Sequence, residues 1–427
     1  MGLIDIVPDA LNGLLYGLGI NKNIKLEGLG RVVASMIGKP DYPGSMVVGI
    51  TEHPMVAAKV PPEKYLSDGK ILAEAGYWVY HKWYGIDYGF NVLDIYNFEA
   101  EALGAKMVYG KASMPTLNFK DHLIKKPEDL DGIKTPIEAD WGRIPYMIDT
   151  IKWNAKLWGM PGGMFCAPLS LACAIRSYPL LMRDMRKNPE FTHRLFKWIV
   201  DDVLVPYVKL LTKETGAKIH FAADLWAAYP NSTPEIAYKW IKPYNMRLTR
   251  ACAKEGIFAA VGGTGMYAEE VKERFNFEVV KKGWDAIVDC MLGAKIPIPV
   301  IEYGGYYEWP YEKVQEYALK NGIPIFGKLP IARGIHSRAM MDGPPEKIAS
   351  DMKHAIDIMG REGRFPIIMM SIPAKTPPEH VHASSQAIKT YGKYPIAKDL
   401  DKIEFKMPEF EPFEKWIKKQ DTDYPWW

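Results

Sequence analysis

Cysteine is scarce in this sequence, with four among 427 residues, and none forms a C-x-x-C pair. Thiols so few and so widely spaced exclude a disulfide framework and favour a reducing compartment. Cys252 and Cys290 fall in helical patterns, where a packing role is the more frequent one. We therefore expect a cytoplasmic protein whose cysteines do not stabilise it through disulfides.

Long apolar runs and a large charge excess are also missing. No stretch approaches the roughly 18 apolar residues of a membrane span. The first twenty residues carry Asp5 and Asp9 and have no basic beginning, unlike a signal peptide. The formal net charge is +3, with no basic stripe of the kind that binds nucleic acid. These absences predict no membrane partner and no nucleic-acid partner.

The sequence does contain a repeated alternation of strand-like and helix-like segments. Short apolar runs rich in β-branched residues predict buried parallel strands, and longer periodic runs predict helices. The predicted strands cover 46–51, 88–96, 162–167, 217–223, 257–262, 298–302, 323–327 and 365–371, with a short extra strand at 104–108. The predicted helices cover 64–85, 176–214 with a break near Asn188, 234–255, 266–293, 310–321, 344–361 and 377–390. The stretch 120–158 is predicted to be irregular.

Eight strand–helix units predict an α/β protein of the (β/α)₈ TIM-barrel class. No Gly-x-Gly-x-x-Gly opens a helix after the first strand, which disfavours an open dinucleotide-binding sheet. We expect one domain, with a barrel at 46–390, an N-terminal extension at 1–45 and an aromatic C-terminal tail at 391–427. In such barrels the active site lies at the carboxyl ends of the strands.

Several segments, in their order along the chain, resemble the uroporphyrinogen decarboxylase superfamily. They include YGIDYGFNVLDIYNFEAEALGAK, CAPLSLA, ETGAKIHFAADLWAAYPNSTPEIAYKWIKPYN, DGPPEKIASDM and IPAKTPPEHVHA. The resemblance spans roughly residues 45–390 and implies a (β/α)₈ barrel. The superfamily includes porphyrinogen decarboxylases and corrinoid-dependent methyltransferases.

Two departures from the superfamily patterns distinguish its branches. Porphyrinogen decarboxylases carry an arginine-rich N-terminal segment that holds substrate carboxylates, but the stretch GITEHPMVAAKVPPEKY here has no arginine. Thiol-methylating members bind zinc through a His-x-Cys-Gly motif and a later cysteine. Here those positions hold Ala259, Val261 and Ser371, so we expect no zinc bound by such a triad. Whether zinc is bound by other ligands stays open.

What remains resembles the methyl-donor side of a corrinoid pathway. The resemblance implies a methyltransferase that moves a methyl group from a methoxylated, aromatic substrate to cob(I)alamin on a small partner corrinoid protein. The alternatives are a decarboxylase of a smaller carboxylate substrate, a methylcobalamin:acceptor methyltransferase and a non-catalytic corrinoid carrier. The carrier is disfavoured because no Asp-x-His-x-x-Gly cobalamin-binding signature is present. A homodimer is a further option.

Ionisable residues follow several of the predicted strands. The candidate catalytic residues are His53, Asp224, Glu302 and His336. Ether cleavage requires the leaving oxygen to be protonated or bound by a Lewis acid, and these side chains can do either. Glu302 and His336 are therefore also candidate metal ligands. The alternatives are salt bridges for the two carboxylates and ordinary hydrogen bonds for the two histidines.

Aromatic residues gather in the same predicted loops, where they could stack on a flat substrate or a corrin ring. The candidate substrate-binding residues are Trp226, Tyr229, Tyr303, Tyr306 and Tyr307. Two other histidine features favour structural roles. His220 lies in the middle of a strand, and the rings of His380 and His382 diverge at a spacing of two on a helix.

Overall fold

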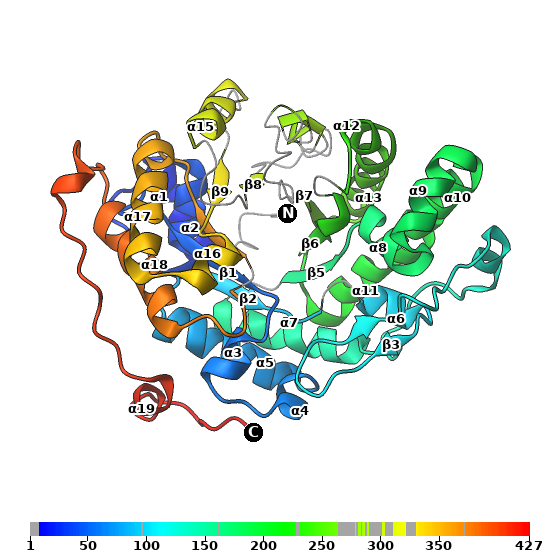
Figure 1. Ribbon diagram of the computed structural model, residues 1–427, viewed down its shortest axis with the longest axis horizontal. Helices are drawn as coiled ribbons and strands as arrows, with labels where there is room; N and C mark the ends of the chain where they lie inside the picture. Colours follow the sequence, from blue (N-terminus) through cyan, green and yellow to red (C-terminus); the bar gives the residue numbers. More distant parts are fainter. Residues whose placement is uncertain are drawn as a thin grey trace.

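The computed structural model describes residues 8–94, 97–159, 162–227, 231–263, 278, 281–282, 284–286, 288–289, 301–303, 311–321, 330–370 and 372–427. Helices and strands alternate along the chain, and in Figure 1 the labelled strands other than β3 lie in the middle with most helices outside them. One hydrophobic cluster includes residues from Leu29 to Ile417, so elements from both ends of the chain share a core. The fold is mixed α/β.

Eight parallel strands form three hydrogen-bonded groups. Their order is β10-β1-β2, β5-β6-β7 and β8-β9. The strands are β1 (Ser45–Gly49), β2 (Tyr88–Asn91), β5 (Gly162–Cys166), β6 (Ile219–Asp224), β7 (Phe258–Gly263), β8 (Ile301–Tyr303), β9 (Ile331–Arg333) and β10 (Ile367–Met370). A separate antiparallel pair consists of β3 (Met107–Val108) and β4 (Thr116–Leu117). Among the described residues the hydrogen-bonded ladders do not close a ring, so the eight-stranded barrel itself stays a prediction.

Helices follow most of the strands. The α-helices are α1 (Pro8–Gly17), α2 (Gly28–Ile37), α3 (His53–Ala57), α4 (Pro62–Tyr65), α5 (Gly69–Gly76), α6 (Phe98–Ala102), α7 (Ile144–Trp158), α8 (Pro168–Arg176), α9 (Tyr178–Lys187), α10 (Pro189–Trp198), α11 (Val205–Thr215), α12 (Pro234–Ile236), α13 (Lys242–Lys254), α15 (Tyr311–Lys320), α16 (Ser337–Asp342), α17 (Pro345–Ala355), α18 (Pro378–Tyr391) and α19 (Phe413–Ile417). The π-helical segments are η2 (Tyr77–Trp83), η4 (Ile199–Leu204), η6 (Ala237–Ile241) and η8 (Ile356–Gly360), and the 3₁₀ segments are η3 (Pro127–Gly132), η5 (Leu225–Ala227) and η9 (Leu400–Lys402). None of the helices in the described part of the chain has the length and apolar character that a bilayer crossing needs.

The sequence predictions agree with the structure where the local signals were strong. The helical stretch 176–214 does break at Asn188, whose side chain accepts a hydrogen bond from the Phe191 backbone N–H at 3.3 Å and so caps α10. The prediction that 120–158 is irregular is wrong from Ile144 onward, because α7 occupies 144–158. Its buried residues recur every three or four positions, which is the signature of an amphipathic helix.

The strand prediction differs from the structure between residues 323 and 333. The predicted strand at 323–327 lies outside the described residues. The described strand β9 (Ile331–Arg333) pairs with β8 and was not predicted. Its three residues are too few to show a local pattern, and only the non-local ladder identifies them.

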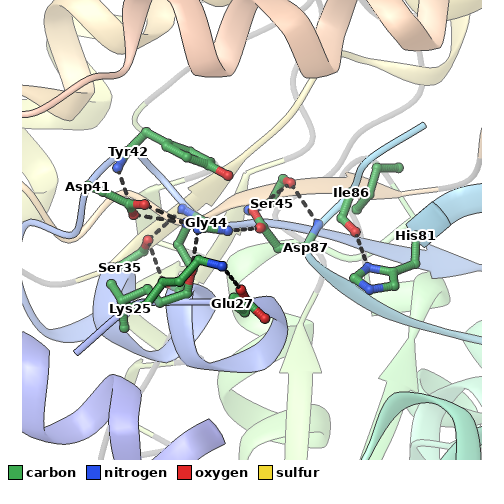
Figure 2. Close-up of polar contacts among 12 residues, drawn as sticks. Lys25, Glu27, Ser35, Asp41, Tyr42, Gly44, Ser45, His81, Ile86 and Asp87 are labelled. Carbon is green, nitrogen blue, oxygen red and sulfur yellow. Dashed lines mark hydrogen bonds and ion pairs between the residues drawn. The ribbon is translucent and has the colours of Figure 1, made fainter. Parts of the chain in front are cut away.

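A buried ion-pair cluster joins α2 to the amino ends of β1 and β2 (Figure 2). The Arg31 side chain is 8% exposed; its Nε donates to Asp41 Oδ1 at 2.8 Å, and its guanidinium also contacts Asp87. Asp87 Oδ2 accepts hydrogen bonds from the Ser45 backbone N–H at 2.9 Å and from Ser45 Oγ at 3.1 Å. This cluster lies at the strand ends opposite Asp224, where barrel folds keep residues that serve stability.

The C-terminal tail lies against η2 and α3. In Figure 1 it runs down the side of the molecule to α19. Trp83 Nε1 donates to the Glu411 carbonyl oxygen at 3.0 Å, and the Tyr424 hydroxyl donates to the Ala58 carbonyl oxygen at 3.2 Å. Phe413 and Ile417 of α19 are buried. These two side chains of the tail therefore extend the core.

Candidate active site

Asp224 is the last residue of β6, in the middle of the β5-β6-β7 group. Its side chain is fully buried, and Oδ1 accepts hydrogen bonds from the Ser170 backbone N–H at 3.0 Å and from Ser170 Oγ at 2.7 Å. Oδ2 accepts no hydrogen bond of ordinary geometry within the described residues, although Asn245 lies near enough to influence it. The prediction that this strand carries His220 and ends at Asp224 is confirmed.

The surroundings of Asp224 favour its protonated form. Burial raises the pKa of the Asp224 carboxyl to about 7, and the hydrogen bonds from Ser170 and Asn245 offset only part of that effect. A carboxyl group with a pKa near 7 exists in both protonation states at neutral pH. It can therefore donate a proton to a leaving group and recover it from solvent afterwards.

Glu99 is a second fully buried carboxyl group at the same end of the strands. It lies on α6, which follows β2, and its Oε1 accepts a hydrogen bond from the backbone N–H of Cys166 at 2.9 Å. Cys166 ends β5, and the other carboxylate oxygen of Glu99 has no hydrogen-bond partner within the described residues. Burial raises the pKa of Glu99 to about 7, against the opposing effect of the Cys166 N–H. Two carboxyl groups with pKa values of about 7, Glu99 and Asp224, thus lie near the carboxyl end of β5.

Cys166 lies between these two carboxyl groups. Burial raises the pKa of its thiol well above the ordinary value, and the nearby charges of Glu99 and Asp224 raise it further. Burial likewise raises the pKa of Cys173 well above the ordinary value and that of Cys252 to about 12. Because the thiolate is the nucleophilic form, these three thiols are poor methyl acceptors.

An ion-pair cluster holds the segment that carries Glu99. Asp94, which follows β2, has a φ of 61°, in the left-handed region that a non-glycine residue rarely adopts. Arg143 contacts the Asp94 carboxylate and donates from Nε to Glu101 Oε2 at 2.6 Å. Its guanidinium also lies 4.7 Å from the centre of the Phe98 ring. Burial raises the pKa of Asp94 to about 6, with Arg143 opposing that rise.

His53, a predicted catalytic residue, lies after β1 with both ring nitrogens near protein atoms. Nδ1 is 3.1 Å from the Pro373 carbonyl oxygen, and Nε2 is 2.9 Å from the Tyr84 hydroxyl oxygen. Burial lowers the pKa of His53 to about 4, and the hydrogen bonds to the backbone at Pro373 and Ala374 oppose that effect. A neutral, doubly hydrogen-bonded imidazole of this kind positions α3 against the segment after β10. These contacts favour a structural role over acid catalysis.

The other two predicted catalytic residues are Glu302, which belongs to β8, and His336, which follows β9. His336 is the N-cap of α16, where its Nδ1 accepts a hydrogen bond from the Arg338 backbone N–H at 3.2 Å. Glu302 and Tyr303 belong to β8, but their side chains are not described. Within the described part of the chain no group of three or more His, Cys, Asp or Glu residues could hold a metal ion. Metal binding by Glu302 and His336 therefore stays a prediction.

Of the predicted substrate-binding aromatics, Trp226 is placed beside Asp224. Its backbone N–H donates to Ser170 Oγ at 3.4 Å, and its ring stacks on Tyr178 with centres 5.1 Å apart and planes at 21°. Tyr229, Tyr306 and Tyr307 lie outside the described residues. The stacked Trp226–Tyr178 pair is thus connected to the buried acid through Ser170.

His220 has the structural role that the sequence favoured. Its side chain is fully buried, and Nε2 lies 3.1 Å from the Ala217 carbonyl oxygen and 3.0 Å from Thr212 Oγ1. Burial lowers its pKa to about 4, so the ring is neutral at physiological pH.

Residues 44–391 match the family described as uroporphyrinogen decarboxylase (URO-D). That range includes Asp224, Glu99 and every parallel strand described above. The chain belongs to the uroporphyrinogen decarboxylase family. Its members are enzymes, and this family member has the mixed strand–helix fold that its sequence predicted.

Two relatives of this family member bear on its fold and chemistry. A uroporphyrinogen decarboxylase from Myxococcus xanthus (strain DK1622) is 30% identical over 134 residues, which are 30% of this chain and 37% of that protein. A methyltransferase from Methanosarcina mazei superposes with a TM-score of 0.63 at 17% identity, over 84% of this chain and 97% of that one. At such low identity the second likeness shows a shared fold only.

Proposed function

We propose that this chain is a methyltransferase that removes a methyl group from a methoxylated, aromatic substrate and delivers it to cob(I)alamin carried by a small corrinoid protein. The observation that supports the proposal is Asp224, a buried acid with a pKa near 7 at the carboxyl end of β6. We also propose that the three groups of parallel strands are arcs of one (β/α)₈ barrel, whose strand ends hold the site.

The reaction breaks the bond between the substrate oxygen and its methyl carbon. When the partner protein is bound, the corrinoid supplies the electron pair that forms the new bond to that carbon. The aryl oxide leaves with the electron pair of the broken bond, and Asp224 donates its proton to that oxygen to give the phenol. General acid assistance of this type contributes about 10²–10⁴-fold in rate. Solvent then returns the proton to Asp224.

The described residues fit an external methyl acceptor. The three described cysteine thiols are buried with raised pKa values, so none offers a thiolate for the methyl group. The Trp226 backbone N–H contacts Ser170 Oγ, and the ring of Trp226 stacks on Tyr178, a pair that suits a planar aromatic substrate. Ser170 holds Asp224 Oδ1 in place, which leaves Oδ2, the oxygen without a hydrogen bond of ordinary geometry among the described residues, as the atom that donates the proton.

A decarboxylase of a smaller carboxylate substrate is the second candidate. It is favoured by the family match and by the Myxococcus xanthus relative. The stretch 49–65 contains no arginine, so a substrate with as many carboxylates as a porphyrinogen would find no bidentate guanidinium partner there. A single carboxylate would make no such demand.

An activity assay with the purified chain separates the two candidates. The chain is incubated with a panel of methoxylated benzoates and free cob(I)alamin as the acceptor, and the phenol and carbon dioxide formed are both quantified. We expect phenol from at least one methoxylated benzoate, and a rate at least about 10²-fold lower for Asp224→Asn. Asp202→Asn is the matched control, because Asp202 is exposed on η4. Equal rates for Asp224→Asn and the unmodified chain would contradict the role of Asp224, and carbon dioxide without phenol would support the decarboxylase.

A further inference from the structure

A cavity of about 620 Å³ lies between η2, α18 and the part of the tail around residues 408–416. That volume falls in the range of small-molecule sites, which is about 300–1,000 Å³. None of its lining residues belongs to β6 or α8, which hold Asp224 and Ser170. Tyr84 is the link to the strand ends, because it lines the cavity while its hydroxyl lies 2.9 Å from His53 Nε2.

One face of α18 supplies a row of polar groups to this cavity. His382, Ser385, Gln386 and Lys389 recur at intervals of three and four residues, and all four line the cavity. His382 is 7% exposed and Ser385 5% exposed, yet His382 Nε2 and Ser385 Oγ have no hydrogen-bond partner within the described residues. Buried polar atoms in native proteins nearly always have partners, so each of these two atoms still has the capacity for one hydrogen bond to a ligand.

The charges that face the cavity favour an anion. Lys82 and Lys389 line it, and no ion pair of either lysine appears among the described contacts. Two carboxylates also line it, but both oxygens of Glu411 lie 2.6 Å from Lys419 Nζ, which leaves Glu409 as the uncompensated negative charge. Burial lowers the pKa of His382 to about 4, and the nearby charge of Lys389 lowers it further, so the imidazole is neutral.

Aromatic rings also line the cavity. The ring of His382 stacks on Phe410 with centres 4.2 Å apart, and the edge of Trp83 meets it at 5.0 Å. The hydrogen bond from Trp83 Nε1 to the Glu411 carbonyl oxygen fixes the indole ring. Rigid aromatic faces beside lysine ammonium groups suit a planar body with a negatively charged end.

We propose that this cavity is a second ligand site, separate from the strand-end site, and that it binds a planar organic anion of the aromatic carboxylate class. The carboxylate lies against Lys389, Ser385 Oγ and His382 Nε2, and the aromatic body packs against Phe410 and Trp83. The inference does not depend on the proposed methyl transfer, because it rests on other residues.

Calorimetric titration of the full chain with 2-naphthoate tests the site. We expect one molecule bound per chain with a Kd of about 1 mM, as ordinary ligand efficiency gives for about 13 heavy atoms. The neutral 2-naphthamide should bind about 10-fold more weakly or not at all. Lys389→Gln should weaken naphthoate binding about 10-fold, whereas Lys393→Gln should leave it unchanged, because Lys393 is exposed and outside the cavity lining.

Phe410→Ala is a second variant that tests ligand binding at the same site. Phe410 is partly exposed at 37%, so the variant should remain folded while losing the stacked face. We expect weaker binding of naphthoate to this variant and a smaller loss for benzoate, which has less ring area to stack. Absence of naphthoate binding to the unmodified chain would overturn the proposal, as would binding that neither Lys389→Gln nor Phe410→Ala changes.

Discussion

Replacing Asp224 by asparagine should stabilise the folded chain at alkaline pH more than at acid pH. Asp224 is fully buried, and its pKa of about 7 in the folded chain compares with about 3.9 in an unfolded chain. Because the folded state binds this proton more tightly, the stability that the neutral acid contributes is present in full below about pH 4. It is then lost as the pH rises through about 7. Asparagine cannot ionise, and its Oδ1 can still accept the two hydrogen bonds from Ser170.

The magnitude follows from the difference between the two pKa values. A shift of about three units corresponds to about 4 kcal/mol of unfolding free energy across the whole titration. Between pH 5 and about pH 7 the folded chain holds this proton and the unfolded chain does not, so about two of the three units are lost over this range. The unfolding free energy of Asp224→Asn relative to the unmodified chain should therefore increase by about 2.7 kcal/mol between pH 5 and pH 8. Glu99 titrates in both proteins, and its contribution therefore cancels from the difference.

The assay is urea unfolding of three proteins at pH 5, 6, 7 and 8. The unmodified chain and Asp224→Asn are compared directly, and Asp202→Asn controls for the loss of one exposed negative charge. A difference that stays constant within about 0.5 kcal/mol across these pH values would refute the reasoning, because it would mean that Asp224 is ionised in the folded chain throughout.

Three further predictions concern other residues. Glu99→Gln should show the same trend, because burial raises the pKa of Glu99 to about 7. Its unfolding free energy relative to the unmodified chain should rise by about 2 kcal/mol between pH 5 and pH 7, and a pH-independent difference in urea unfolding would contradict this. Arg31→Met should lower the unfolding free energy by about 3–5 kcal/mol, because it leaves the buried Asp87 carboxylate without its cation, and a loss below about 1 kcal/mol would count against it. Trp226→Leu should raise the KM for the methoxylated benzoate about 2- to 12-fold with less change in kcat, because the stacked pair with Tyr178 is lost, and an unchanged KM would exclude Trp226 from substrate binding.

The part of the site that the sequence predicted correctly depends on local pattern. The run 217–223 is short and mostly apolar, as in a buried strand, and Asp224 follows it directly, so its place at a strand end could be inferred without the fold. The α7 helix could also have been predicted, because Ile144, Met147, Ile148 and Ile151 carry the helical period. The polar residues between them hid that period.

Glu99 could not have been identified as a buried acid from local sequence alone. Its helix α6 has five residues, and the described hydrogen bond to its side chain comes from Cys166, 67 positions later in the chain. His53 shows the converse case. Its position after β1 suggested catalysis, but its hydrogen bonds join it to Tyr84, 31 positions later, and to Pro373, 320 positions later. In both cases the contacts that decide the role of the residue come from distant parts of the sequence.

The central claim is that this chain breaks a methyl–oxygen bond with Asp224 as the acid. The most direct measurement follows a methoxylated benzoate labelled with carbon-13 at both the methoxyl and the carboxyl carbon, by NMR, in the presence of cob(I)alamin. We predict that the methoxyl carbon leaves the substrate and appears in the corrinoid fraction while the carboxyl carbon stays on the ring, and that Asp224→Asn slows this at least about 10²-fold. Labelled carbon dioxide released with the methoxyl group intact would contradict the account.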